Sequence, residues 1–311
     1  MRRRRKLTLP RLERPDGARL PLDLAVIRAA LSRSPAMPRS LLRRAAFRAI
    51  GGRLPALIAS YEDGRRFRVP ARDALYAQVF IDGAYEPAET AVAMELLSPG
   101  DFAIDVGANV GWFSLAMASS VGAKGQVWAI EPVPPLLRQL HSNLELNPTL
   151  PVDVLPFALG RADGQATLHL FAGLVNAHAS MSRLGRDDYV EFSAEVKALD
   201  GLLGQTSCRP VLIKLDVEGA EFAVIEGASL AVSDSPAIWM IEVNFQTSAA
   251  FGYHPADLLQ PLRAAGVYAF YRVVEGGRLQ AESDPGGAPH GTTWLCVPDR
   301  YAARAEHLLS P

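Results

Sequence analysis

One stretch near the middle of the chain, residues 101–132, concentrates side chains that can bind a charged or hydroxylated ligand. An apolar run ends there in Asp105, and a turn carrying Gly107 and Gly111 follows. A helix-like run and a second apolar run come next, and the second run ends in Glu131. This succession predicts the first half of a nucleotide-binding βαβ unit. The glycines permit a tight turn and close approach of the backbone to a ligand, and a carboxylate can accept hydrogen bonds from both hydroxyls of a ribose.

The residues of the turn discriminate between two adenosine cofactors. A dinucleotide fingerprint has glycine at three positions, so that a pyrophosphate meets bare backbone. Here Asn109 and Trp112 hold the second and third positions, and both side chains would crowd a pyrophosphate. S-adenosylmethionine carries no phosphate, so we favour it over NAD, with its tail ammonium on Asp105 and its ribose on Glu131. The alternative is an ordinary α/β turn without a ligand, which leaves the two acids without a role.

Length and composition are those of a globular protein. The 311 residues suffice for one large or two modest domains, and 49% are hydrophobic and 21% charged. No apolar run approaches the roughly 18 residues that a bilayer span needs, and no signal peptide is visible. Two cysteines, Cys208 and Cys296, make neither a disulfide framework nor a metal set. A reducing, cytoplasmic location is therefore expected.

Basic residues are concentrated in the N-terminal part of the chain. Residues 1–72 hold 19 of the 32 basic residues but only 5 of the 33 acidic ones. Such a segment could contact a membrane surface, nucleic acid or the acidic remainder of the chain, or could be a solvated arm. It is also compatible with an organelle transit peptide. We expect a basic extension over residues 1–60, disordered in residues 1–20 and helical in 21–60, followed by one domain over 61–311.

The rest of the chain alternates predicted strands and helices. A hairpin over 61–70 precedes a helix that begins near Pro87. Strands are expected at 102–104, 127–130, 152–159, 211–217 and 237–243, with helices at 113–120, 134–147, 219–228 and 255–265. The strand at 167–171 is expected to pair back on the strand at 152–159, and an edge strand is expected at 195–199. Residues 267–274 and 292–297 are expected to form a closing antiparallel hairpin. This pattern predicts a Rossmann-like α/β fold with a mostly parallel sheet flanked by helices.

Acidic residues end four of the predicted parallel strands. Right-handed crossovers place the ends of parallel strands along one rim of the sheet. The five residues at that rim are Asp105, Glu131, Ala158, Asp216 and Glu242. Carboxylates gathered in one crevice predict a functional site there.

Several sequence blocks together resemble a known family. They occur in the order G-x-Y-E-P (83–87), D-V-G-A-N-V-G (105–111), E-P (131–132), A-L (158–159), L-D (199–200) and K-L-D-V-E-G-A-E (214–221). Over about residues 60–250 the chain resembles the FkbM family of S-adenosylmethionine-dependent methyltransferases. The resemblance implies a class I methyltransferase fold and, commonly, O-methylation of a hydroxyl of a small molecule, sugar or natural product. The chain has Gly160-Arg161 where members often have Ser-Asp, so the adenine end of the pocket departs from the family pattern.

These considerations define the predicted cofactor-binding residues and the possible partners. The predicted cofactor-binding residues are Glu86, Asp105, Val106, Gly107, Ala108, Asn109, Gly111, Glu131, Pro132, Ala158 and Asp216. The expected partner is a small-molecule or glycan acceptor, and a homodimer or a peripheral contact of the basic N-terminus with an anionic surface is possible. An RNA methyltransferase anchored by this basic segment is the alternative function, although no N-P-P-Y-type block follows the fourth strand. A non-catalytic module is the third hypothesis.

Methyl transfer to an alcohol calls for a base or a metal ion. Asp216 is expected beside the donor sulfur, where it holds the cofactor tail or the acceptor hydroxyl. Glu218 either joins it or caps the helix that starts near Gly219. Glu242 ends the next strand on the acceptor side, and His178 is either a base in a flexible loop or merely exposed.

Two further pairings follow from neighbouring strands. Lys214 is expected to pair with Glu242. Asp216, Glu242 and Asn244 could hold Mg²⁺ through oxygen ligands, but three separated positions form no dedicated motif. We therefore predict no metal ligand.

Overall fold

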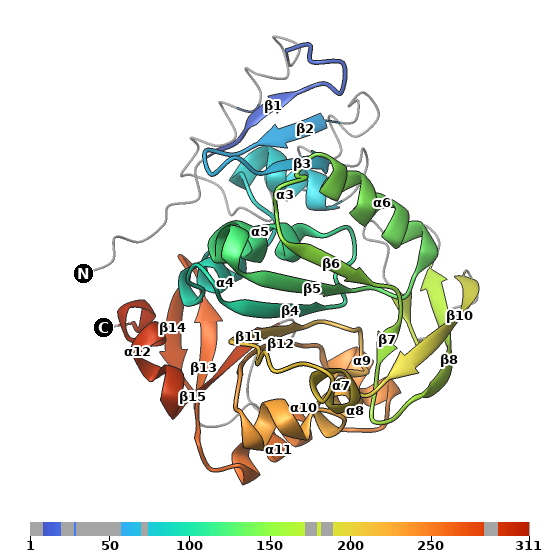
Figure 1. The fold of residues 1–311 in the computed structure, drawn as a ribbon, viewed down its shortest axis with the longest axis vertical. Helices are drawn as coiled ribbons and strands as arrows, with labels where there is room; N and C mark the ends of the chain where they lie inside the picture. The colour runs from blue at the N-terminus through green and yellow to red at the C-terminus, as the bar shows by residue number, and fades with distance from the viewer. Residues whose placement is uncertain are drawn as a thin grey trace.

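A large central sheet organises the computed structural model, which describes residues 9–19, 28, 57–69, 74–171, 179–181, 189–282 and 292–310. Figure 1 shows this sheet running through the middle of the molecule. Its eight strands are β4 (Phe102–Val106), β5 (Gln126–Ile130), β6 (Val152–Leu155), β11 (Leu212–Leu215), β12 (Ile238–Val243), β13 (Tyr268–Val274), β14 (Arg278–Ala281) and β15 (Thr292–Pro298).

The strand order is β14-β13-β15-β12-β11-β4-β5-β6. The chain adds β5 and β6 on one side of β4 and then returns to add β11 and β12 on its other side, so the order of the strands reverses next to β4. The five strands from β6 to β12 are parallel, and β15, β13 and β14 add to them in antiparallel pairs. The predicted closing hairpin is confirmed, with β14 as an additional edge strand. The chain thus has the predicted class I methyltransferase fold. A sheet of this kind binds ligands at the carboxyl ends of the strands beside the point of reversal.

Helices cover both faces of the sheet. They are α3 (Ala74–Asp82), α4 (Pro87–Leu96), α5 (Trp112–Val121), α6 (Pro134–Glu145), α7 (Leu199–Leu203), α8 (Glu221–Glu226), α9 (Phe245–Ala250), α10 (Pro255–Leu258), α11 (Gln260–Ala264) and α12 (Ala302–Ala305). Short turns at Gly122–Lys124, Asp299–Tyr301 and Glu306–Leu308 are 3-10 helical, and Leu230–Asp234 is a π-helical turn.

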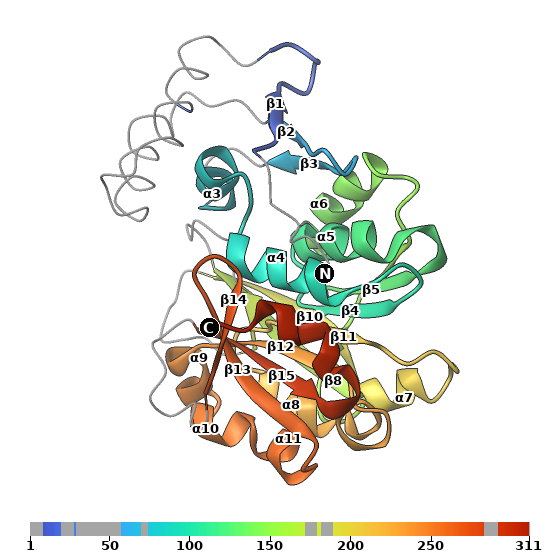
Figure 2. The ribbon, with the colours of Figure 1, turned by 90° about the vertical axis from the view of Figure 1, so that its left-hand side faces the viewer.

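Alternation along β4 divides the core into two layers. Ala103 belongs to the apolar cluster that includes side chains of α4 and α5, whereas Phe102 and Ile104 belong to the cluster that includes α7, α8, α10 and α11. Figures 1 and 2 show these two groups of helices on opposite sides of the sheet. Successive side chains of a strand point to opposite faces, so the near-continuous apolar run of a central strand fills both layers.

A second sheet lies beside the first and corrects three predictions. It consists of β7 (Ala158–Leu159), β8 (Gly164–Phe171), β9 (Ala179–Ser180) and β10 (Tyr189–Lys197), in the order β7-β10-β8-β9. The predicted strand over 152–159 is broken at Pro156, which has no N–H to donate to a ladder. β8 pairs with β10 rather than back on β6, and β10 is therefore a central strand and not an edge.

The N-terminal residues that the structure describes form a third, antiparallel sheet of β1 (Arg11–Glu13), β2 (Leu57–Ser60) and β3 (Arg66–Val69). The hairpin predicted over 61–70 is confirmed. The expectations of disorder at 11–13 and of helix at 57–60 were wrong, because these residues pair as strands whose apolar side chains are buried: Leu12, Leu57, Ile58 and Ala59. The sheet spans the boundary expected at residue 60. The helices expected over 21–56 lie outside the described residues, apart from Arg28.

Gly107 determines how closely the first turn approaches the fourth parallel strand. Its φ is +81°, and a Cβ placed on it would lie 1.8 Å from the backbone oxygen of Asp216. Only glycine accommodates both the left-handed backbone and this contact. The turn after β4 and the segment after β11 therefore meet, and the residues on each are brought to one place.

The first prediction compares two glycines with similar backbone angles. Gly107→Ala should lower the free energy of unfolding more than Gly100→Ala, by about 1–3 kcal/mol, because only the former adds overpacking to backbone strain. Gly100 has a φ of +91° and open space around its Cβ position. Urea unfolding of both variants measures the difference, and equal losses would contradict the close contact at Gly107.

Candidate functional site

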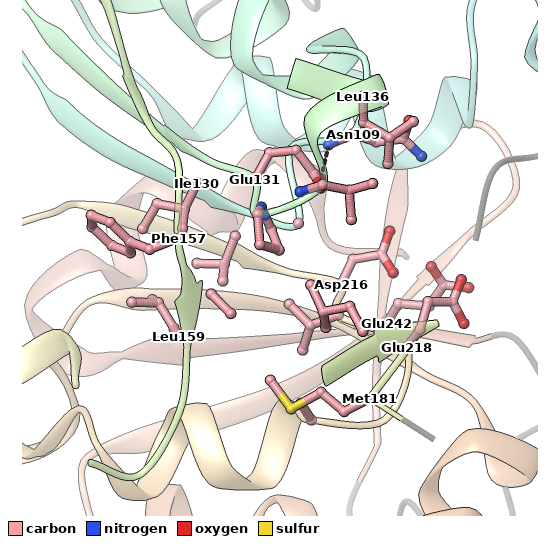
Figure 3. Close-up of a pocket in the computed structure, with 18 of the residues that line it drawn as sticks. Asn109, Ile130, Glu131, Leu136, Phe157, Leu159, Met181, Asp216, Glu218 and Glu242 are labelled. Atoms are coloured by element: carbon pink, nitrogen blue, oxygen red, sulfur yellow. Dashed lines mark hydrogen bonds between the residues drawn. The ribbon is translucent and has the colours of Figure 1, made fainter. Parts of the chain in front are cut away.

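A cavity of about 280 Å³ opens at the carboxyl ends of β4, β5, β11 and β12. Figure 3 shows Ile130, Phe157 and Leu159 toward one end of it. Asp216, Glu218 and Glu242 gather at the other end, with Met181 below them. The cavity is thus apolar where the second sheet contributes its wall and acidic where β11 and β12 end.

Most of the predicted site residues line this cavity or a smaller one beside it. The large cavity is lined by Glu86, Val106, Gly107, Asn109, Glu131, Pro132, Ala158, Asp216, Glu218 and Glu242. The smaller cavity, of about 40 Å³, is lined by Asp105 and Ala108 together with Lys214, and both cavities share Tyr85, Gly107, Asn109 and Asp216. His178 lies outside the described residues.

Gly111 lines neither cavity, and its contact with the ligand stays a prediction. It precedes α5 with a φ of +87°, and a Cβ on it would lie 2.4 Å from Cδ1 of Leu140. The glycine is needed where the turn packs against α6. This role and a ligand contact leave the same mark in a sequence, because both require a residue without a side chain.

Glu131 is held by two backbone amides at the rim of the sheet. Its Oε1 accepts a hydrogen bond from the Val133 N–H at 2.9 Å, and its Oε2 accepts from the Asn109 N–H at 2.8 Å (Figure 3). The residue is 4% exposed, and burial raises its pKa to about 7. Each carboxylate oxygen can accept a further hydrogen bond. The arrangement can therefore present two fixed acceptors to a pair of hydroxyls.

Asp105 is buried and only half satisfied. Its Oδ2 accepts a hydrogen bond from the Ser114 hydroxyl at 2.6 Å, whereas its Oδ1 has no hydrogen-bond partner among the described residues. Burial raises the pKa of this carboxyl, and the nearby Lys214 ammonium opposes that effect. A buried polar atom without a partner is costly, so Oδ1 is a candidate contact for a polar ligand.

Lys214 is a buried cation among these acids. Its Nζ lies 3.0 Å from Oδ2 of Asp216 and 4.5 Å from the centre of the Phe113 ring. The predicted pairing with Glu242 was wrong, because Asp216, two residues along the same chain, lies within reach. Burial alone would lower the pKa of Lys214, but Asp216, Asp105 and other carboxylates raise it above its ordinary value. The side chain is therefore charged.

Glu86 enters the cavity from the turn before α4. It has a left-handed φ of 41°, and its N–H donates to Oε1 of Gln78 at 2.8 Å. Burial raises its pKa to about 7, while the Lys214 charge and a hydrogen bond with Tyr85 lower it. Burial also raises the pKa of Tyr85 well above its ordinary value. Tyr85 lines both cavities but was not among the predicted site residues, although it stands inside the G-x-Y-E-P block.

Glu242 and Glu218 complete the acidic end. The charge of Asp216, followed by burial, raises the pKa of Glu242 well above its ordinary value. The helix cap considered for Glu218 is not found, because no side chain caps the N-terminus of α8. Instead Oε1 of Glu221 accepts from the N–H groups of Val217 and Gly219 in the turn before this helix, each at 3.1 Å. Glu218 has a left-handed φ of 54° and lines the cavity. Sequence spacing alone could not choose between two acids three residues apart.

The oxygen ligands considered for Mg²⁺ are not all available. The side-chain oxygen of Asn244 accepts hydrogen bonds from the N–H groups of Gln246 at 3.0 Å and Thr247 at 3.3 Å, and so caps α9. In the described part of the chain, no three His, Cys, Asp or Glu side chains are arranged to hold a metal ion.

Comparison with known proteins identifies the family. Residues 105–267, more than half of the chain, match the methyltransferase FkbM domain. The chain belongs to the FkbM methyltransferase family. The matched residues contain the acids of both cavities except Glu86, which lies before them.

The relatives of this FkbM chain are distant. "Methyltransferase 1" of Beauveria bassiana is 27% identical over 173 residues, covering 49% of this chain and 66% of its own length. "Methyltransferase sdnD" of Sordaria araneosa is 29% identical over 182 residues, covering 49% and 67%. The crystal structure of an FkbM methyltransferase from Methylobacillus flagellatus KT aligns with a TM-score of 0.44 and 15% identity, covering 83% of this chain and 60% of that one. This chain therefore spans about two thirds or less of each relative.

Among the helices that the structure describes, none has the length and apolar character required to cross a lipid bilayer.

The raised pKa of Glu86 generates a prediction about stability and pH. A carboxyl whose pKa rises from 4.5 to about 7 on folding stabilises the fold below pH 4.5, and this contribution disappears as the pH rises through 7. Glu86→Gln removes the titrating group and keeps an acceptor for Tyr85. Relative to wild type, Glu86→Gln should gain roughly 1–3 kcal/mol in free energy of unfolding between pH 4.5 and pH 8.

Urea unfolding across this pH range measures the effect, with Glu62→Gln at an exposed position as the control. A parallel pH dependence in wild type and Glu86→Gln would show that Glu86 is not buried in the way described.

Proposed function

We propose that this chain is an S-adenosylmethionine-dependent methyltransferase that methylates a hydroxyl of a small molecule, a sugar or a natural product. The observation that carries the proposal is the pair of fixed acceptors on Glu131, which lies between an apolar and an acidic end of one cavity. Family membership supports methyl transfer, and the arrangement of the cavity supports this cofactor.

The residues present fit the parts of S-adenosylmethionine. Ile130, Phe157 and Ala158 supply an apolar wall for adenine, and Glu131 supplies acceptors for both ribose hydroxyls. Asp105 Oδ1 supplies an acceptor for the tail ammonium. The remaining predicted contacts, Val106, Gly107, Ala108, Asn109, Pro132 and Asp216, form the walls between these points.

The charge of the cavity argues against phosphate-bearing ligands. Glu86, Glu131, Asp216, Glu218 and Glu242 all line it. Those that are ionised repel a phosphate at short range, and the described residues that line this cavity include no Arg, Lys or His to bind one, so a pyrophosphate or a polynucleotide backbone is disfavoured. The same argument disfavours the RNA methyltransferase alternative. Membrane contact of the basic segment and dimerisation stay predictions.

The chain's own residues can prepare a hydroxyl for methylation. When bound, S-adenosylmethionine supplies an electrophilic methyl group. Glu242 takes the proton that the acceptor hydroxyl loses as its oxygen forms the new bond, because a carboxylate of raised pKa is the stronger base. Asp216, held by Lys214, lies beside it and keeps that pKa raised. Glu218 lines the same cavity and can position the acceptor, Glu86 stays a predicted cofactor contact, and a role for His178 stays a prediction.

The third prediction tests the cofactor. Wild type should bind S-adenosylhomocysteine, and Glu131→Ala should weaken binding by about 10–100-fold because charged hydrogen bonds to the ribose are lost. Glu145→Ala, at an exposed position on α6, should bind as wild type does. Isothermal titration calorimetry measures all three. Absence of binding by wild type would end the proposal, and unchanged binding by Glu131→Ala would end the assignment of Glu131.

The fourth prediction tests the base. Glu242→Gln should lower kcat by about 10²–10⁴-fold, the usual contribution of a general base, and leave S-adenosylhomocysteine binding intact. Wild-type kcat should fall as the pH drops below the raised pKa of Glu242, and the variant should lose this dependence. Transfer of tritiated methyl to a panel of hydroxylated small molecules measures both. A variant with the wild-type rate and pH profile would rule out Glu242 as the base.

A further inference from the structure

The small cavity beside Asp105 is a distinct chamber of the site. Its volume of about 40 Å³ exceeds the 10–15 Å³ or so that a single water requires on the same measure. Phe113 and Trp112 of α5 form an aromatic wall, and Gly107 and Asn109 form the side shared with the large cavity. A ligand in the large cavity can therefore extend a small polar group into this chamber.

Two groups of opposite charge present unused hydrogen-bonding capacity in the chamber. Asp105 Oδ1 is buried without a hydrogen-bond partner among the described residues. Lys214 Nζ carries three protons, and among the hydrogen bonds of the described residues it has one acceptor, Oδ2 of Asp216 at 3.0 Å. A second side of the ammonium rests on the Phe113 ring. One carboxylate oxygen and one ammonium proton are thus left for a ligand.

The sheet places these two groups side by side. Lys214 on β11 and Asp105 on β4 are directly paired in the parallel register, so their side chains project from the same face. Both residues are almost fully buried, at 6% and 1% exposure. A site with one fixed cation and one fixed anion complements a ligand group that carries one charged group of each sign on the same carbon atom, and an α-amino acid is such a group.

A purely structural role would be met by the ion pair of Lys214 with Asp216. That pair uses one of the three ammonium protons and leaves hydrogen-bonding capacity beside the chamber. An α-carboxylate bound to the ammonium makes a charge-assisted hydrogen bond in a low-dielectric chamber, where such bonds are strong.

We propose that Lys214 binds the α-carboxylate of the cofactor's amino-acid tail, beside the α-ammonium on Asp105, and so makes the site selective for a zwitterionic tail. The inference rests on the proposed function and adds a specificity-determining residue to it. An adenosine thioether that lacks the carboxylate leaves the Lys214 ammonium without its second acceptor, and the site discriminates against it.

Calorimetry with two ligands tests the inference on the full chain. The ligands are S-adenosylhomocysteine and its decarboxylated analogue, 5′-deoxy-5′-(3-aminopropylthio)adenosine. Wild type should bind the former about 10–100-fold more tightly, since a charged hydrogen bond is lost with the carboxylate. Lys214→Gln should reduce this preference to about threefold or less, because the amide cannot replace a charged donor. Lys124→Gln, at an exposed position, should keep the wild-type preference.

Each outcome decides between the two proposals. Equal binding of both ligands by wild type overturns the role of Lys214 without requiring any variant, so a folding defect in Lys214→Gln leaves the inference falsifiable. Equal weakening of both ligands by Lys214→Gln also overturns it, since a structural lysine would act on the whole site. Binding of neither ligand by wild type defeats the proposed function instead.

Discussion

A single buried ammonium, that of Lys214, makes the acidic site of this protein possible. Burial of a carboxylate in a low-dielectric interior disfavours its charged form, and several carboxylates close together disfavour it further. Lys214 opposes both effects at Glu86, Asp105 and Glu242, whose pKa values it lowers against the burial that raises them. The carboxylates in turn keep the ammonium charged. Neither set of charges would be tolerated at this depth without the other.

Backbone packing brings the two halves of the site together. Asp105 and Glu131 belong to the first βαβ unit, whereas Asp216, Glu218 and Glu242 lie at or just beyond the carboxyl ends of β11 and β12, more than eighty residues later in the chain. The contact of Gly107 with the Asp216 backbone joins them, since a side chain at 107 would hold the two segments apart. The reversal of strand order between β4 and β11 leaves the crevice into which both sets of acids project.

The second sheet gives the cavity its polarity. Phe157, Ala158 and Leu159 come from the β7 segment, and Leu168 comes from β8, so the apolar end of the cavity is built by strands outside the central sheet. The β7 segment leaves the central sheet after Pro156, where a backbone donor is missing. A continuous third strand would have kept these side chains in the central sheet and away from the place where an adenine ring would lie.

The sequence alone predicted the parallel sheet, its helices and the acids at its rim, because hydrophobic periodicity, glycine turns and strand-end positions are local signals. These signals located Asp105, Glu131, Asp216 and Glu242 correctly at the rim. Only the tertiary structure decided the partner of Lys214, the hydrogen bonds of Glu221 to the turn before α8, the packing role of Gly111 and the pairing of β8 with β10. Each of these depends on which of several equally suitable neighbours lies within a few ångströms, and that distance is set by the packing of segments far apart in the chain.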